Sequence, residues 1–147
     1  MKLNLEISNP EKKPVKKDFV QETIKQTIKE IKWNFFDKKN ISVSVAIVGK
    51  SEIKKINRLY RKKNEVTDIL SFSEFKKISE LKKHPGELFL GELILCYDDV
   101  REYSQKKGIK LKKELANVIS HGVLHLLDFK HGKKMFDIQK KVSEKYK

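Results

Sequence analysis

The chain has 147 residues, the length of one ordinary domain, and 38% of them are hydrophobic. It contains 34 Lys and Arg residues against 20 Asp and Glu residues, so its formal net charge is +14. This composition excludes a disulfide-stapled fold, because Cys96 is the single cysteine, and a membrane span, because no stretch approaches roughly 18 apolar residues.

From these properties we expect one domain, residues 1–147, in the cytoplasm and without a membrane partner. The N-terminus lacks the apolar run of a signal peptide. The net charge is informative about partners, and nucleic acid is the commonest polyanion that a basic protein meets. The alternative explanation of the positive net charge is a surface that is rich in lysine without any role in binding.

Alternating apolar residues predict two strands in the first part of the chain, Leu3–Ile7 and Ile41–Ile47. Between them, Asp18 is the expected N-cap of a helix, with Gln21 in the capping-box position. The apolar residues of this helix follow helical spacing: Val20, Ile24, Ile28, Ile31 and Phe35. A second helix follows the second strand, with Ser51 as its expected cap. Its expected core side consists of Ile53, Ile56, Leu59 and Tyr60.

Two more strands are expected in the middle of the chain. The first is short, Ile69–Phe72, and a polar loop over residues 74–87 follows it. The second, Leu88–Cys96, is an almost continuous apolar run, which is typical of a central strand.

The last third of the chain predicts three helices. Asp98 or Asp99 is expected to cap a short helix that Gly108 ends. Two further helices are expected at about Leu111–Leu127 and Lys133–Tyr146. The order βαβαββααα predicts an α+β fold, in which a single small mixed β-sheet is packed by helices.

Three of the four histidines fall within eleven residues of one another, around the end of the long predicted helix. His121 and His125 are four residues apart, which places both imidazoles on one face of the predicted helix. This face borders the apolar stripe of the helix, formed by Leu111, Leu115, Val118 and Gly122. His131 can join them only if the chain turns after about Leu127, and Asp128 tolerates the left-handed backbone of such a turn. Ordinary surface or core histidines are the alternative.

Three neutral imidazoles leave the fourth position of a tetrahedral zinc site open for water, which is typical of a catalytic site. A bound metal lowers the pKa of that water towards about 7. Nickel, copper and iron also accept imidazole ligands. We therefore predict a three-histidine metal site, preferably for Zn²⁺, at the end of a core helix.

The same histidine spacing occurs in metzincin proteases, which read H-E-x-x-H-x-x-G-x-x-H. A metzincin-like metalloprotease or hydrolase is therefore an alternative function. The chain has Gly122 where these enzymes carry the catalytic glutamate, and Asp128 where they carry glycine. The protease interpretation thus lacks its general base.

The second predicted helix carries a basic stripe, in which Lys54, Arg58 and Arg61 are spaced by four and three residues. Lys50 and Lys62 extend it. Arginine can bind a phosphate through two parallel hydrogen bonds. Arg61 lies at the end of the predicted helix and is the candidate for this role. Lys54, Arg58 and Lys62 are candidate RNA-binding residues, with a solvated helix face as the alternative.

Three segments together resemble the bacterial YbeY family. Tyr60-Arg61 followed by Thr67–Phe72 resembles its T-D/N-V-L-S-F signature, and Leu90–Leu93 resembles its L-G-D-I segment. The third segment, from His121 to His131, resembles its H-G-x-L-H-L-x-G-x-D-H metal motif. Met135 and Gln139 fit the family's last helix.

The resemblance implies a metal-dependent, single-strand-specific endoribonuclease that holds one Zn²⁺ per chain on His121, His125 and His131. It implies a role in maturation of the small-subunit ribosomal RNA 3′ end and in ribosome quality control. Its partners would be single-stranded or ribosomal RNA and the small ribosomal subunit, and no DNA is expected. Arg61 and His121 are the residues to which it assigns catalysis.

Two residues depart from the family pattern, Asp128 in place of glycine and Lys130 in place of aspartate. Lys130 removes a carboxylate that could orient a histidine, and Asp128 is a candidate to replace it. A non-catalytic, ribosome-associated RNA-binding factor therefore stays open as an alternative. The nucleophile, a metal-activated water or the RNA 2′-OH, is open as well. Asp68 and Ser71 either line the substrate cleft near the metal or make hydrogen bonds within the turn and at the strand end.

Overall fold

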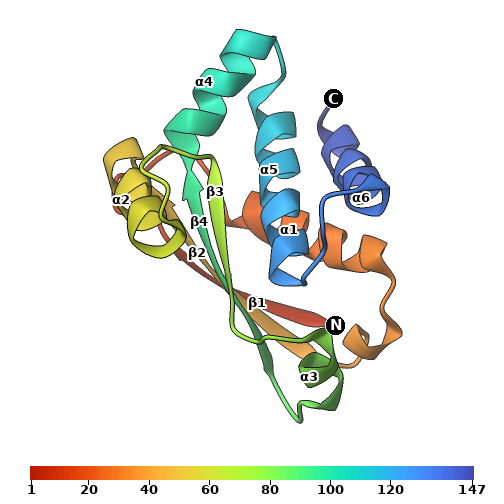
Figure 1. Ribbon diagram of the computed structural model, residues 1–147. Coiled ribbons are helices and arrows are strands. Elements are labelled where there is room, and N and C mark those ends of the chain that lie inside the picture. The colour runs from red at the N-terminus through yellow and green to blue at the C-terminus, as the bar shows by residue number, and fades with distance from the viewer.

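The computed structural model describes residues 1–147 and contains four strands and six α-helices (Figure 1). The strands are β1 (Lys2–Ser8), β2 (Asn40–Val48), β3 (Ile69–Ser73) and β4 (Leu88–Cys96). The helices are α1 (Lys17–Ile31), α2 (Lys50–Arg61), α3 (Ile78–Lys83), α4 (Tyr97–Lys107), α5 (Leu111–Leu126) and α6 (Lys133–Ser143). Short 3₁₀ turns follow α1, at Asn34–Phe36, and α6, at Glu144–Tyr146.

The four strands form one mixed sheet in the order β1-β2-β4-β3. The pairs β1–β2 and β2–β4 are parallel, whereas β3 runs antiparallel to β4. The predicted α+β fold with a single small mixed sheet is therefore confirmed, and Leu88–Cys96 is a central strand as expected. The strand β3 lies at the sheet edge next to α5.

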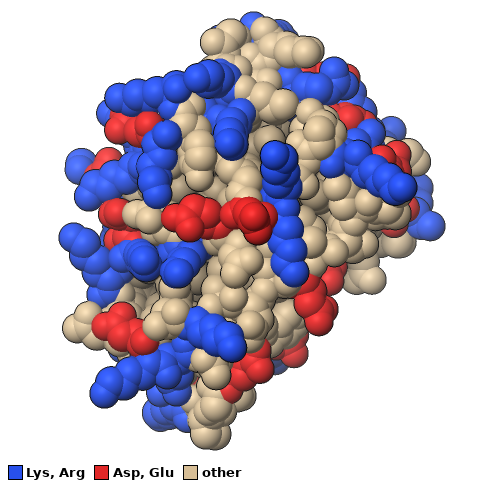
Figure 2. Space-filling view, turned by 180° about the vertical axis from the view of Figure 1, so that it is seen from behind, with Lys and Arg blue, Asp and Glu red and all other residues tan.

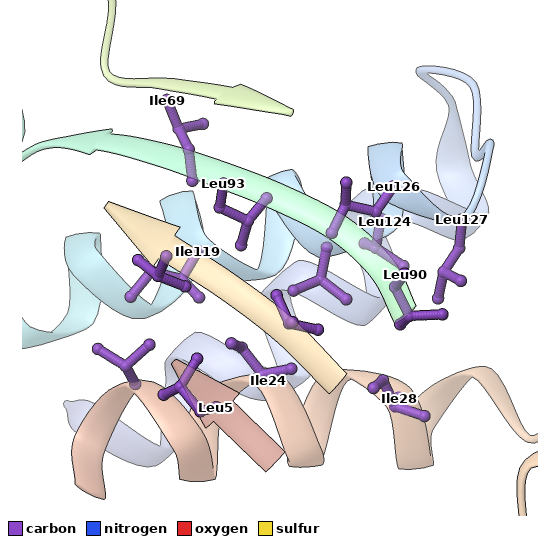
Figure 3. Close-up of a cluster of buried hydrophobic side chains, with 14 of the residues drawn as sticks. Leu5, Ile24, Ile28, Ile69, Leu90, Leu93, Ile119, Leu124, Leu126 and Leu127 are labelled. Atoms are coloured by element: carbon purple, nitrogen blue, oxygen red, sulfur yellow. The ribbon is translucent and has the colours of Figure 1, made fainter. Parts of the chain in front are cut away.

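The main core lies between one face of the sheet and the helices α1 and α5, as Figure 3 shows. Leu90 and Leu93 of β4 share this core with Leu124 and Leu126 of α5, and α6 packs against α5 and α1. The helix α2 covers part of the opposite face through a smaller cluster around Ile53. The sheet and α1 thus support α5, which carries the first two histidines.

The expected side-chain N-caps are wrong for three helices. Asp18 lies inside α1, which begins at Lys17, and α2 begins at Lys50, before Ser51. The chain passes directly from β4 into α4, so Asp98 and Asp99 lie in the first helical turn. None of the three helix starts has a side-chain cap hydrogen bond. Acidic residues in a first turn still interact favourably with the helix dipole.

The predicted core side of α2 is wrong at its C-terminal end. Ile53 is buried, but Leu59 and Tyr60 are 60% and 68% exposed, and Asn57 is buried instead. The reason is that the last turn of α2 lies beside β3, an edge strand, with no further strand to cover it. Asn57 donates a hydrogen bond to the Glu65 carbonyl and holds the loop after the helix.

Other boundaries differ slightly from expectation. The predicted polar loop 74–87 contains the short helix α3, because Leu81 is buried against the main core. The helix α1 ends at Ile31, so Phe35 belongs to the following 3₁₀ turn. None of the helices combines the length and the apolar character needed to cross a membrane.

Candidate metal centre

The histidines His121 and His125 lie in the last two turns of α5, and both are half-buried. The neighbours Gly122, Val123 and Leu124 are buried between the helix and the sheet. The two imidazoles therefore stand at the border of the core, as the sequence predicts, held by a packed helix and still accessible.

A tight turn after α5 brings back the third histidine. Asp128 adopts a φ of +64°, and its backbone N–H donates to the His125 carbonyl at 3.0 Å. The Phe129 N–H then donates to the Leu124 carbonyl at 2.9 Å. The chain reverses there, and His131 meets the other two histidines. The predicted turn at Asp128 is confirmed.

The three imidazoles converge through their Nε2 atoms. The His125 Nε2 lies 3.0 Å from the Nε2 of His121 and 3.0 Å from that of His131. One ligand atom from each of the three residues lies within 4.8 Å of the others. A tetrahedral zinc ion with bonds of about 2.0–2.1 Å separates its nitrogen ligands by about 3.3 Å, so the two 3.0 Å separations around His125 are close to what such an ion needs.

Burial lowers the pKa of the His125 imidazole, and the neighbouring His121 and His131 imidazoles lower it further. A neutral imidazole is the form that binds a metal, because its lone pair is free. The packing around His125 therefore favours the metal-binding form of this residue at neutral pH.

The other ring nitrogen of His121 has a partner on α6. The His121 Nδ1 lies 3.1 Å from Oε1 of Gln139, and Gln139 Nε2 donates to Asn117 Oδ1 at 3.1 Å. The Asn117 amide in turn faces the buried Glu114 carboxylate at 3.4 Å. Because the Asn117 amide nitrogen faces Glu114 and the Gln139 amide nitrogen donates to Asn117, the Gln139 oxygen is the atom that faces His121. The His121 Nδ1 then carries the proton, and its Nε2 is free for a metal.

Gln139 therefore supplies an outer hydrogen-bond partner for His121, although the chain has Lys130 where the family pattern has aspartate. Asp128 does not do so, because its side chain pairs with Lys130 at 3.1 Å on the exposed surface. The sequence pattern places Gln139 in the last helix but indicates no function for it. The sequence feature that marks it is a polar residue on the buried face of α6, beside the apolar Ile138 and Val142.

Replacing Gln139 with leucine is expected to weaken zinc affinity about 10- to 100-fold, the usual effect of removing such an outer partner of a ligand. Gln139→Glu keeps an acceptor at this position and is expected to retain the affinity better than leucine. Competition with a chromophoric chelator measures both variants. Equal affinities for the leucine variant and the unmodified protein would contradict the role of Gln139.

The Arg61 side chain is anchored to the edge strand β3. Its guanidinium donates to the Ser71 carbonyl and lies 4.7 Å from the centre of the Phe72 ring. The Ser71 hydroxyl donates to the Gly122 carbonyl at 2.9 Å, next to His121. The strand β3 thus connects Arg61 to the helix that carries the histidines. Asp68 accepts a local hydrogen bond from the Ile69 N–H at 2.7 Å.

The remaining basic residues of α2 point to solvent. Lys54, Arg58 and Lys62 are exposed, and none of them forms an ion pair. Lys50 pairs with Glu102, and this hydrogen bond raises the pKa of its ammonium group. Figure 2 shows lysine and arginine spread over a whole face of the molecule, with acidic residues between them. Positive charge is therefore not confined to the α2 stripe.

Gly122 occupies the position of the metzincin glutamate, and an added Cβ atom would press on side chains of the core. A Cβ atom at Gly122 would lie 2.7 Å from Ile69 Cδ1 and 3.0 Å from Leu93 Cδ2. This position faces the sheet, so a carboxylate placed there would point into the core. The geometry thus removes the support for a metzincin-type base.

The comparisons with known proteins agree with this geometry. The family model described as "Endoribonuclease YbeY" matches residues 6–147. A protein named Endoribonuclease YbeY from Buchnera aphidicola is 41% identical over 63% of this chain, and the match spans 56% of that protein. A protein of the same name from Caldicellulosiruptor bescii is 35% identical over 76% of this chain and 72% of its own length.

A solved structure is similar over most of the chain. The solution structure of a Thermotoga maritima protein superposes with a TM-score of 0.60 at 26% identity, over 97% of this chain and 87% of that one. The mixed sheet with its packed helices is therefore a fold already seen in an experimental structure.

Proposed function

The chain belongs to the YbeY family, and on this premise we propose that residues 1–147 form one metal-dependent endoribonuclease domain that cleaves single-stranded RNA. The observation that carries the proposal is the convergence of three imidazole Nε2 atoms next to the strand that anchors Arg61. A protease would need a general base at Gly122, where a side chain would point into the core between α5 and the sheet.

In this proposal His121, His125 and His131 hold one Zn²⁺ ion. Three neutral nitrogen donors favour zinc and leave a further coordination position accessible, as in catalytic zinc sites. When bound, such an ion supplies an activated water and stabilises negative charge on a phosphate oxygen. The protein's own part is to fix the three rings, with Gln139 holding the proton on His121 Nδ1.

We assign to Arg61 the binding of the scissile phosphate. Its guanidinium keeps free donors after its bond to the Ser71 carbonyl, because arginine has five N–H groups. Stacking on Phe72 holds its plane in position. The exposed Lys54, Arg58 and Lys62 extend this charge along α2 and would attract the RNA backbone without reading its sequence.

Replacing Arg61 with alanine is expected to lower the rate of RNA cleavage about 100-fold or more, as expected when a donor to a developing charge is lost. Arg61→Lys keeps the charge but loses the planar fork, so an intermediate rate is expected. Initial rates on a fluorogenic single-stranded RNA measure this. Arg101→Ala on α4 is the matched control, and equal rates for both alanine variants would contradict the assignment.

For the cellular role we propose maturation of the small-subunit ribosomal RNA 3′ end and ribosome quality control, with the small ribosomal subunit as partner. The similarity to proteins named Endoribonuclease YbeY supports this assignment. Deleting the gene should lead to accumulation of small-subunit RNA with an extended 3′ end. If this RNA matures normally while the purified protein still binds ribosomes, a non-catalytic binding factor is the better description.

A further inference from the structure

A cleft of about 390 Å³ lies between α5 and α6, and two of its lining residues, Phe136 and Gln139, lie next to the histidines. Gln139, which contacts His121, forms part of its floor. Phe136, in the first turn of α6, forms part of its wall, and its ring lies 6.3 Å from the His131 ring. The cleft thus adjoins the histidine site on the side of α6.

Phe136 is an unusual residue for this surface. Its side chain is 52% exposed, whereas the core stripe of α6 consists of Met135, Ile138, Gln139, Val142 and Ser143. The ring plane lies at 32° to that of His131. A large apolar ring left open beside a polar site is best covered by a flat partner, because stacking buries its face without filling a deep pocket.

The charged groups around the cleft are separated, with lysines at the rim and a carboxyl group at the floor. Lys113 and Lys140 lie on its rim, and neither forms an ion pair within the protein. The floor contains the amides of Asn117 and Gln139 and the buried Glu114 carboxyl. A carboxyl group at the floor disfavours an anion there, so phosphates belong at the rim and an uncharged base belongs inside.

We propose that this cleft binds one unpaired nucleobase of the RNA, adjacent to the phosphate at the histidines. Phe136 stacks on the base, and Lys113 and Lys140 bind the flanking phosphates. The placement next to the cleaved bond rests on the proposed endoribonuclease function, whereas the base-binding cleft itself does not. Bases in a duplex are already paired and stacked, so the cleft accepts single strands only.

The test compares Phe136→Ala with Phe89→Ala, an exposed phenylalanine on the far face of the sheet. The zinc-loaded proteins are titrated into a labelled single-stranded RNA oligonucleotide and into a blunt duplex of the same sequence. The incubation is short, and a gel checks that the RNA stays intact. Phe136→Ala is expected to weaken single-strand binding about 5- to 100-fold, the usual effect of losing one stacked base, and to leave duplex binding unchanged.

Two further variants make the result specific to stacking and charge. Phe136→Trp should restore single-strand affinity, and its additional fluorescence, relative to the unmodified protein, should be quenched by the single strand but not by the duplex. The double variant Lys113→Ala/Lys140→Ala should reduce the salt dependence of single-strand binding, with a slope smaller by about one to two. Lys82→Ala/Lys83→Ala on α3 controls for the lost charge.

The proposal is overturned if Phe136→Ala and Phe89→Ala behave alike, or if single-strand and duplex binding fall together. These outcomes are separable from a failure of the proposed nuclease activity. Absent cleavage by the unmodified protein with a selective loss of single-strand binding in Phe136→Ala would leave the base-binding cleft standing. Normal cleavage with no effect of Phe136→Ala would reject the cleft and keep the nuclease.

Discussion

Replacing His125 with alanine is expected to abolish zinc binding and, with it, RNA cleavage. His125 is the middle ligand, since its Nε2 lies 3.0 Å from both other Nε2 atoms, and burial favours its neutral form. Without it the two remaining imidazoles form no more than a weak site. The expected zinc content falls from about one ion per chain to none, and cleavage falls by about three orders of magnitude or more, because the activated water is lost.

Elemental analysis of the tag-free protein, followed by cleavage assays on single-stranded RNA, checks this expectation. His84→Ala is the matched control, because His84 is the one histidine outside the cluster and lies exposed beyond α3. Zinc retained in His125→Ala would refute the three-ligand site. Cleavage that persists in a zinc-free variant would refute a metal-dependent mechanism while leaving the family assignment intact.

Replacing Gly91 with alanine is expected to destabilise the protein by about 3–5 kcal/mol, at the upper end of single substitutions. Gly91 is buried in β4 opposite Ser73 of β3 and has a φ of +138°, a backbone region that L side chains rarely adopt. A Cβ atom there would lie 2.1 Å from the Phe72 carbonyl oxygen. Because this contact is with backbone, relief requires β3 to move away from β4.

Urea unfolding, with the zinc removed by a chelator, measures the free energy of unfolding of this variant. Gly108→Ala is the matched control, because Gly108 also has a positive φ of +67° but nothing within 4 Å of the added Cβ. Backbone strain from a positive φ costs about 1–2 kcal/mol. The additional loss of unfolding free energy in Gly91→Ala relative to Gly108→Ala therefore measures the steric contact with β3. An equal loss of unfolding free energy in both variants would show that β3 moves away from the added Cβ atom at no energetic cost.

The Gly91 substitution should also affect the metal centre. The hydroxyls of Ser71 and Ser73 on β3 donate to the carbonyls of Gly122 and Leu126 on α5. A displaced β3 therefore loses its bonds to the helix that carries His121 and His125. It also carries the Ser71 carbonyl that anchors Arg61. We expect the folded fraction of Gly91→Ala to bind zinc less tightly than the unmodified protein.

Much of the metal centre could be predicted from the sequence, because its geometry is local. Two histidines four residues apart on a helix share one face whatever the helix packs against, and the turn at Asp128 needs only one left-handed residue. The mixed sheet could be predicted as well, because alternating and continuous apolar runs distinguish half-buried from central strands. These features depend on backbone periodicity over a few residues.

Other features were decided by contacts between distant parts of the chain. Gln139 reaches His121 because α6 packs on α5, and no local pattern states which buried polar residue faces which ring. Leu59 and Tyr60 follow the apolar spacing of α2 but remain exposed, because that turn lies beside an edge strand. Periodicity predicts which face of an element is apolar, whereas the extent of its burial depends on the neighbour.

By itself, then, the sequence determined the three histidines, the turn that joins them and the order of the strands and helices. Tertiary packing was needed for the contact of His121 Nδ1 with Gln139, the anchoring of Arg61 through β3, and the placement of Phe136 beside His131. The physical reason is that hydrogen bonds and ring contacts act over a few ångströms. Only the packing of whole elements brings residues from different parts of the chain to such distances.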